Sequence, residues 1–193
     1  MKKLLFIALL LIPCLGFSQT TKPIEGFLGI KFGSSKDEVI AAMKAKGYKP
    51  GVSNNNSDPI LDFGSITYGH RQTTEFGVKF VDNKAYQAVF IFKADEEPKT
   101  IIYYNNLIND INENYGPGDQ HRIFRSPYAD GDGDEITAIS GGYADYFTNW
   151  FDSNKNDIQV KITSEMNVIV FYTNGTLADQ AKAKAKEKEK GDY

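Results

Sequence analysis

Apolar residues recur at helical spacing in two segments of this chain and alternate with polar residues in most of the others. Residues 36–46 and 100–115 carry apolar side chains three or four positions apart, which predicts two helices. Gly47 and Gly116 follow these segments, and glycine commonly ends a helix. Ser35 and Glu38 have the spacing of a capping box, so we expect the first helix to begin directly after Ser35.

Alternation with a period of two predicts strands along the rest of the chain. Residues 85–92 have apolar side chains on both faces, which indicates a strand covered on both sides. Asp82-Asn83-Lys84 predict a turn before it, and the Asn-, Ser-, Gly- and Pro-rich residues 49–59 predict a surface loop. The expected strands are residues 26–33, 60–68, 73–81, 85–92, 121–125, 136–151 with a break, 157–163 and 166–172.

Helices among hairpin-linked strands indicate an α+β domain with helices packed on an antiparallel sheet. Both halves run from one helix into about three strands, which suggests a duplicated αβββ unit, testable by superposing residues 35–93 on 99–172. We expect a single domain over residues 19–175. Residues 176–193, rich in Lys, Ala and Glu, have no wide apolar stripe, so we interpret them as a solvated or frayed tail.

Residues 1–18 have the composition of a signal peptide. Lys2 and Lys3 precede an apolar run, residues 4–12, that is too short to span a bilayer as a helix. Gly16 and Ser18 are small residues of the kind that signal peptidase recognises. We therefore expect cleavage after Ser18 and an exported protein, periplasmic or secreted, with no transmembrane segment in the mature chain.

A lipid anchor is the alternative to soluble export. Leu11-Ile12-Pro13-Cys14 outlines a lipobox with Cys14 as the acceptor, but Pro13 stands where a small residue is usual and restricts the backbone before it. We favour cleavage after Ser18, which also removes Cys14, the only cysteine. The mature chain then has no disulfide and no thiolate metal ligand.

The charge balance bears on the class of partner. The 193 residues include 22 basic and 25 acidic ones, a net charge of −3 at pH 7, and losing Lys2 and Lys3 makes the chain more acidic. The one lysine cluster lies in the tail, among glutamates. A nucleic-acid binder needs a basic face, so we expect no nucleic-acid partner.

Motifs of catalysis are absent from the sequence. It contains no H-E-x-x-H, no G-x-S-x-G and no glycine-rich phosphate loop, and His70 and His121 have no neighbour at ligand spacing. We name no catalytic residue and favour a protein without enzymatic activity. Two distant carboxylates acting as acid and base stay open as an alternative.

Four carboxylates fall within six residues: Asp130, Asp132, Asp134 and Glu135. Such oxygen ligands suit calcium, but an EF-hand loop needs glycine at its sixth position and glutamate at its twelfth, where this chain has Glu135 and Gly141. We favour an acidic hairpin turn, keep an irregular calcium site as the alternative, and expect no other cofactor.

An aromatic cluster gives the candidate contact surface. In an extended segment Tyr146 and Trp150 share one face, whereas Tyr143, Phe147 and Phe151 share the other. One face is expected to be core and the other a ligand or partner surface. We name Tyr143, Tyr146 and Trp150 as contact candidates, a prediction that fails if Trp150 is buried.

Residues 27–39, Phe-Leu-Gly-Ile-Lys-Phe-Gly-Ser-Ser-Lys-Asp-Glu-Val, with residues 112–117, resemble a group of small exported bacterial proteins of unknown function that share a G-I-x-F-G-x-S-x-x-E-V opening. The element order is also similar to β-lactamase-inhibitor-type and outer-membrane-assembly lipoprotein domains. Because these motifs are caps and turns, the resemblance implies no catalytic residue.

The sequence thus predicts an exported binding or interaction module that contacts an envelope protein or a glycan through its sheet. The alternatives are a carbohydrate-binding module and an unrecognised cell-envelope hydrolase.

Overall fold

The computed structural model describes residues 22–51 and 60–191, so the expected signal peptide, Cys14 and most of the expected loop 49–59 lie outside the described residues. The helices are α1 (Lys36–Ala45), α2 (Thr100–Tyr115), α3 (Glu135–Ser140), α4 (Gly175–Gly191) and the 3-10 turn η1 (Glu97–Lys99). The strands are β1 (Gly26–Phe27), β2 (Ile30–Lys31), β3 (Ile60–Asp62), β4 (Thr67–Tyr68), β5 (Arg71–Gln72), β6 (Glu75–Val81), β7 (Lys84–Lys93), β8 (Asp119–Phe124), β9 (Ala144–Phe151), β10 (Asn156–Ile162) and β11 (Asn167–Asn174).

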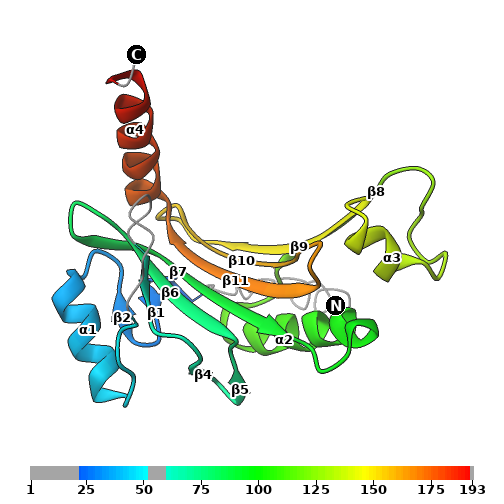
Figure 1. Cartoon of the computed structure of the whole chain (residues 1–193), viewed down its shortest axis with the longest axis horizontal. Coiled ribbons are helices and arrows are strands. Elements are labelled where there is room, and N and C mark those ends of the chain that lie inside the picture. Colours follow the sequence, from blue (N-terminus) through cyan, green and yellow to red (C-terminus); the bar gives the residue numbers. More distant parts are fainter. Residues whose placement is uncertain (1–21, 52–59, 192–193) are drawn as a thin grey trace, which may run out of the picture.

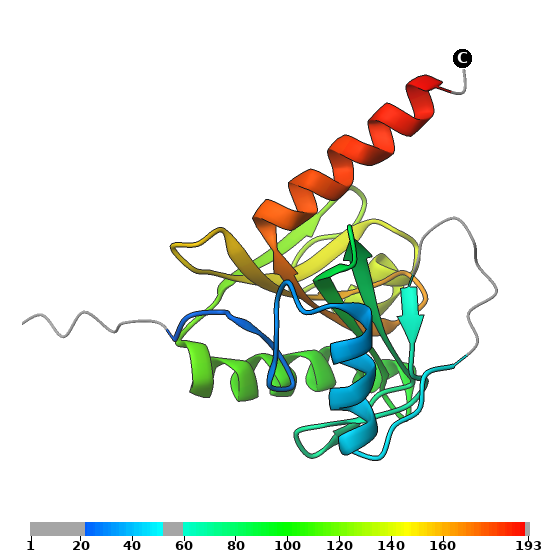
Figure 2. The ribbon, with the colours of Figure 1, turned by 90° about the vertical axis from the view of Figure 1, so that its left-hand side faces the viewer.

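Seven of these strands form one antiparallel sheet in the order β3-β6-β7-β11-β10-β9-β8. Helices α1 and α2 and the β1–β2 hairpin lie against one face of it, as Figures 1 and 2 show from two directions. The predicted α+β class, with helices on an antiparallel sheet, is confirmed. The capping box is confirmed too, since Glu38 N donates to Ser35 Oγ and Ser35 N donates to Glu38 Oε2.

The strand order is symmetric about the centre of the sheet. β7 ends the first half of the chain and β11 ends the second, and these two strands pair antiparallel at the centre, with Val89 opposite Phe171. From each of them the sheet continues outward through strands of its own half. This order is the one that a duplicated αβββ unit related by a two-fold axis would give, with β8 as an additional edge strand; superposition of the halves is still its test.

The faces of the sheet differ in how they are covered. On the face beneath the helices Phe76, Phe90, Phe92, Val170 and Ile158 are buried in the main core. The opposite face of β7 carries Val89 and Ile91, which are only half-buried. The prediction of a strand covered on both sides was therefore wrong for this second face. The apolar run of β7 alone could not reveal it, because the missing layer belongs to other parts of the chain.

Three further predictions about strands were wrong. Residues 26–33, expected as one strand, form the hairpin of β1 and β2, with positive φ at Leu28 and Gly29 between them. Residues 60–68 form β3 and β4 with a break at Gly64, whose φ of +66° bends the chain. Residues 136–140 belong to α3, and only residues 144–151 form the expected strand. Ala138 and Ile139 bury the inner side of α3 against the sheet. A helix this short contains too few turns for its period to be distinguished from a strand.

The C-terminal tail is not frayed where it is described. Residues 175–191 form α4, which continues directly from β11 and projects from the sheet (Figure 1). Asn174 Oδ1 accepts a hydrogen bond from Leu177 N, and Gly175 N donates to Lys155 O. A Cβ at Gly175 would lie 2.2 Å from that carbonyl oxygen, so glycine permits this close approach. No helix among the described residues is both long and apolar enough to cross a membrane.

Candidate functional site

Two of the predicted contact residues lie in the core. Tyr146 is 2% exposed and Trp150 is 5% exposed. Trp150 Nε1 donates to Asn112 Oδ1 at 3.1 Å and to Gly116 O at 2.9 Å, so the indole joins β9 to the end of α2. The prediction that Tyr146 and Trp150 supply a contact surface was wrong. Tyr143 remains 43% exposed and packs against Tyr128 with ring centroids 5.4 Å apart.

The acidic segment forms a loop before α3 instead of a hairpin turn. Asp132 accepts hydrogen bonds from Ala129 N at 2.7 Å and Asp134 N at 2.9 Å, and these bonds lower the pKa of its carboxyl group. Glu135 accepts from Gly131 N at 3.1 Å, and Asp130 lies 4.0 Å from Arg122. Within residues 22–51 and 60–191 no three His, Cys, Asp or Glu side chains form a metal-binding group. A calcium titration of the melting temperature is the test of the alternative.

A different surface presents apolar side chains. On the sheet face opposite α1 and α2, paired strands place their outward residues side by side: Ile91 with Ile169, Val89 with Phe171, and Lys161 with Phe147. We call this surface the open face and define it by Val89, Ile91, Phe147, Phe151, Ile169 and Phe171. Five of the six are half-buried, and Phe151 is 65% exposed.

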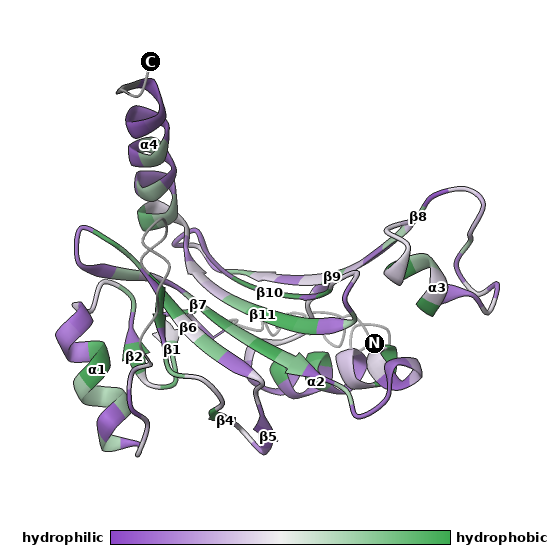
Figure 3. Ribbon diagram, viewed as in Figure 1, coloured by the Kyte–Doolittle hydropathy of each residue, from purple (hydrophilic) through white to green (hydrophobic). Residues whose placement is uncertain are grey.

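Only α4 adjoins this face among the described elements, and it covers one end of it (Figures 1 and 2). Figure 3 shows apolar stretches along β7 and β11, whereas the outer part of α4 is hydrophilic. The open face thus leaves apolar residues at solvent that a further layer could bury. Contiguous apolar surface of this kind marks interaction sites in soluble proteins.

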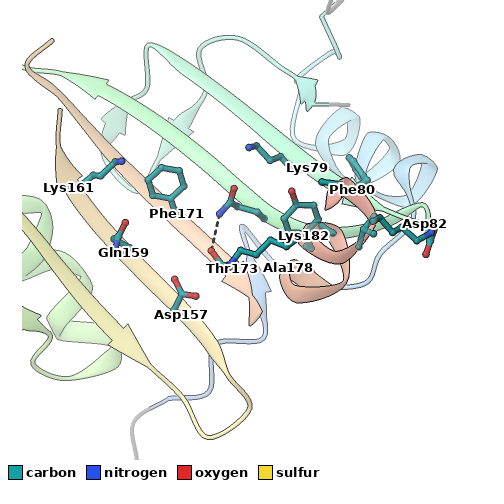
Figure 4. Close-up of a pocket in the computed structure, with 16 residues that line it drawn as sticks. Lys79, Phe80, Asp82, Asp157, Gln159, Lys161, Phe171, Thr173, Ala178 and Lys182 are labelled. Atoms are coloured by element: carbon teal, nitrogen blue, oxygen red, sulfur yellow. Dashed lines mark hydrogen bonds and ion pairs between the residues drawn. The ribbon is translucent and has the colours of Figure 1, made fainter. Parts of the chain in front are cut away.

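A groove of about 750 Å³ runs between α4 and the sheet. Its floor comes from β6, β7, β10 and β11, and Figure 4 shows Lys161, Gln159 and Asp157 along β10 beside Phe171 and Thr173 of β11. Its wall is α4, whose small Ala178, Ala181 and Ala185 leave room above the floor. The register between β6 and β7 shifts at Lys79, and Tyr86 of the shifted segment lines the groove.

Contacts with the β6–β7 turn hold α4 beside this floor. Asp82 accepts a hydrogen bond from Gln180 Nε2 at 2.7 Å and forms an ion pair with Lys184. The turn itself has positive φ at both central residues, Asp82 (48°) and Asn83 (59°), which suits a two-residue hairpin. The width of the groove therefore depends on a local turn that the sequence predicts well.

The groove carries a protonatable acid among cations. Burial raises the pKa of Asp157 to about 6, against the opposing effects of a hydrogen bond with Thr173 and the positive charge of Lys182. Lys161 lies over the Phe171 ring, with Nζ 5.4 Å from its centroid. Lys79 adds a third cation to the lining. Near neutral pH the lysines of the floor and inner wall thus outnumber the carboxylates that they face.

Along β8 and β9 the open face carries aromatic side chains. His121 of β8 stacks on Phe147 with ring centroids 4.7 Å apart, and His121 Nε2 lies 2.9 Å from Asp119 Oδ2. Phe151 is exposed nearby on β9, and Ile123 of β8 is 46% exposed. Phe147 and Phe151 belong to the aromatic cluster that the sequence indicates, on the face that carries only Tyr143 of the three residues that we named.

The local sequence pattern of β9 does not separate its covered face from its open face. Tyr146 and Trp150 alternate with Phe147 and Phe151, and the strand partners decide which set is covered. Asn112 and Gly116, which bind Trp150, lie more than thirty residues away in the chain. This long-range pairing is not visible in the local pattern.

Comparison of the chain with protein-family models, with curated proteins and with solved structures finds no match.

Proposed function

We propose that this protein is an exported binding module whose open face and α4 groove receive an acidic, partly apolar segment of a protein partner. The observation that carries the proposal is the sheet face itself, which presents Val89, Ile91, Phe171 and Phe151 without a covering layer in the described part of the chain. Burial of apolar area contributes about 25 cal/mol per Å², so a layer docked here would be stabilised mainly by these side chains.

The size of the face suits a protein partner. Seven strands spaced about 4.8 Å apart and on average about seven residues long present on the order of 700 Å². A typical protein interface buries about 800 Å² on each partner, and the inner side of α4 adds to the face. A small ligand would leave most of this apolar surface in water.

The charge of the groove supports an acidic segment. Lys161 and Lys182 approach the groove from β10 and α4, whereas Asp157 is the carboxylate in the floor and Asp82 is paired with Lys184. The whole chain is acidic, with a net charge of −3, so this local excess of cations is a feature of the site. Opposite charge across an interface favours specificity and rapid association.

Export is the part of the proposal that rests on residues 1–18. Lys2 and Lys3, the apolar residues 4–12 and the small residues Gly16 and Ser18 support it. We propose a periplasmic or secreted location after cleavage behind Ser18. N-terminal sequencing of the protein from its own host tests this: a chain that begins at Gln19 supports it, and one that begins at a lipid-modified Cys14 contradicts the soluble form.

A peptide titration tests the chemistry of the groove. A labelled peptide that alternates Glu and Leu should bind the chain from Gln19 onward, and its Lys counterpart should not. Lys161→Glu and Lys182→Glu should each weaken binding about tenfold, which corresponds to about 1.4 kcal/mol. Lys186→Glu, an exposed site further along α4, is the matched control. Equal binding of both peptides, or no effect of the groove variants, would contradict the proposal.

The geometry supports the two alternative functions, a carbohydrate-binding module and a hydrolase, less well. A carbohydrate-binding module built on Trp150 loses its named ring, because the indole is buried. For a hydrolase, Asp157 is a carboxyl group with a raised pKa, but the groove places no second carboxylate in an acid–base pair with it, since Asp82 is held by Lys184 and Gln180. We therefore do not propose a hydrolytic reaction.

A further inference from the structure

A second pocket lies on the covered side of the sheet, away from the open face. It encloses about 360 Å³ between the β4–β5 hairpin, the last turns of α2 and β11. Figure 1 shows the hairpin and α2 on the same side of the sheet. This volume is at the lower end of the range for small-molecule sites in proteins.

Three tyrosine side chains from three elements line this pocket. Tyr68 and Tyr172 share a hydrogen bond of 2.6 Å between their hydroxyl groups, and Tyr115 stands beside them at the end of α2. The rings of Tyr68 and Tyr172 pack on Phe90 in the core, which fixes the position of both hydroxyls. The pocket therefore has a rigid phenolic base.

These phenols stay protonated and can donate. Burial raises the pKa of Tyr68 to about 12 and raises those of Tyr115 and Tyr172 as well. Tyr68 and Tyr172 each have one hydroxyl hydrogen, and only one of the two is used in the hydrogen bond between them. The other can be donated to a ligand. Among the described residues the Tyr115 hydroxyl has no hydrogen-bond partner, so at least two donors are available to a ligand.

Hydrogen-bond acceptors from α2 line the same pocket. Asp110 Oδ2 accepts from Arg71 at 2.5 Å and leaves Oδ1 for a ligand, and Glu113 is an exposed carboxylate. Asn114 donates through Nδ2 to Asp110 O, which leaves its side-chain oxygen as an acceptor. Donors and acceptors thus face one small volume.

This combination restricts the chemistry of the ligand. An anionic ligand would face the carboxylate of Glu113 and that of Asp110, whose charge Arg71 partly offsets. An ammonium group only donates hydrogen bonds, so it would offer no acceptor to the hydroxyl hydrogen of Tyr115. An apolar ligand would leave all of these donors and acceptors without a partner. A sugar hydroxyl both donates and accepts. An apolar face of a sugar ring can lie on Ile111 or on the Tyr115 ring, which also has Lys22 Nζ over it at 5.5 Å from the ring centroid.

We propose that this pocket is a binding subsite for one ring of a neutral saccharide, held between the hydroxyls of Tyr68, Tyr115 and Tyr172 and the side-chain oxygens of Asp110, Glu113 and Asn114. The site is separate from the groove and does not depend on the protein partner proposed above.

An NMR titration of the ¹⁵N-labelled chain from Gln19 onward tests this site. The probes are the neutral disaccharides cellobiose and chitobiose, with glucosamine and glucuronate as charged comparators. We expect the neutral sugars to shift the amide signals of residues 68–70 and 110–115, and to bind more tightly than either charged sugar. No binding at millimolar concentration, shifts confined to other residues, or tighter binding of a charged sugar would each overturn the proposal.

Two single substitutions measure the contribution of single polar groups. Tyr115→Phe removes only a hydroxyl without a partner in the described structure, and Glu113→Ala removes an exposed carboxylate, so both variants should fold. Each should raise the Kd for the neutral sugars about tenfold, the value expected for one lost hydrogen bond. Tyr128→Phe, outside the pocket, should leave the Kd unchanged. Unchanged affinity in both pocket variants would also overturn the proposal.

Discussion

At the scale of single residues, Trp150 is the side chain on which the packing between α2 and the sheet depends most. It is buried and donates to both Asn112 and Gly116. Trp150→Phe leaves a cavity and two acceptors without this donor, so we expect the free energy of unfolding to fall by about 2–4 kcal/mol in urea denaturation. A change below about 0.5 kcal/mol would show that the indole is not packed as described.

Gly118 supplies a matched test of the same contact. A Cβ there would lie 2.5 Å from Trp150 Cε2 and 2.7 Å from Thr148 Cγ2. Gly118→Ala should therefore destabilise the protein, and it should cost less in the Trp150→Phe background, where part of the collision is gone. Additive effects in this double-mutant cycle would contradict the contact.

The raised pKa of Asp157 makes the free energy of unfolding depend on pH. Because its pKa is raised to about 6 in the folded state, the folded protein holds a proton that the unfolded chain releases above about pH 4. The stabilisation that this proton provides is fully present below about pH 4 and is lost as the pH rises through about 6. Asp157→Asn should remove this loss, so the variant should gain stability relative to the parent between pH 4 and pH 7. A constant difference across that range would contradict the raised pKa.

Predictability from sequence also differs from residue to residue. Ser35 and Glu38 are three positions apart, and the bonds that they make are local, so their capping box was predicted correctly. Trp150 owes its burial to residues of α2, and Asp157 owes its raised pKa to burial within the folded protein. Such environments depend on the order of strands, which a local pattern does not specify.

At the scale of elements, α4 determines the shape of the groove. Its first residue, Gly175, lies too close to Lys155 O to accept a side chain. Gly175→Ala should displace α4 and increase hydrogen–deuterium exchange of residues 176–185, while exchange in α2 stays unchanged. Asp82→Asn, which tolerates the same positive φ but weakens the ion pair with Lys184, should produce a smaller increase. Unchanged exchange in Gly175→Ala would contradict the anchoring.

The elements differ in how far their sequences reveal them. α2 spans sixteen residues with a full apolar stripe, and its bounds agree with those predicted. α3 has six residues and reads equally well as part of a strand. α4 has no apolar stripe because its contacts with the sheet use alanines and polar side chains, so its composition indicated a solvated tail.

At the scale of the whole molecule, α1 and α2 cover one face of the seven-stranded sheet, whereas among the described elements only α4 adjoins the other. Antiparallel sheets tolerate one exposed face, but that face is usually polar. Here Val89, Ile91, Ile169 and Phe171 make its centre apolar, while the groove beside α4 adds cations. The fold therefore separates a buried core from a partly apolar face, and this separation supports the proposed binding module.

Site-specific photocross-linking tests this central claim most directly. A photoreactive phenylalanine analogue at Phe151 or Phe171, introduced in the native host, should yield the same discrete adduct with a protein from both positions. The analogue at Ile102, which is 60% exposed on α2 at the covered side, should yield none. Lys161→Glu should reduce the yield of the adduct, and mass spectrometry should locate the cross-link in an acidic segment of the partner. Adducts from Ile102 alone, or no adduct from either open-face position, would contradict the account.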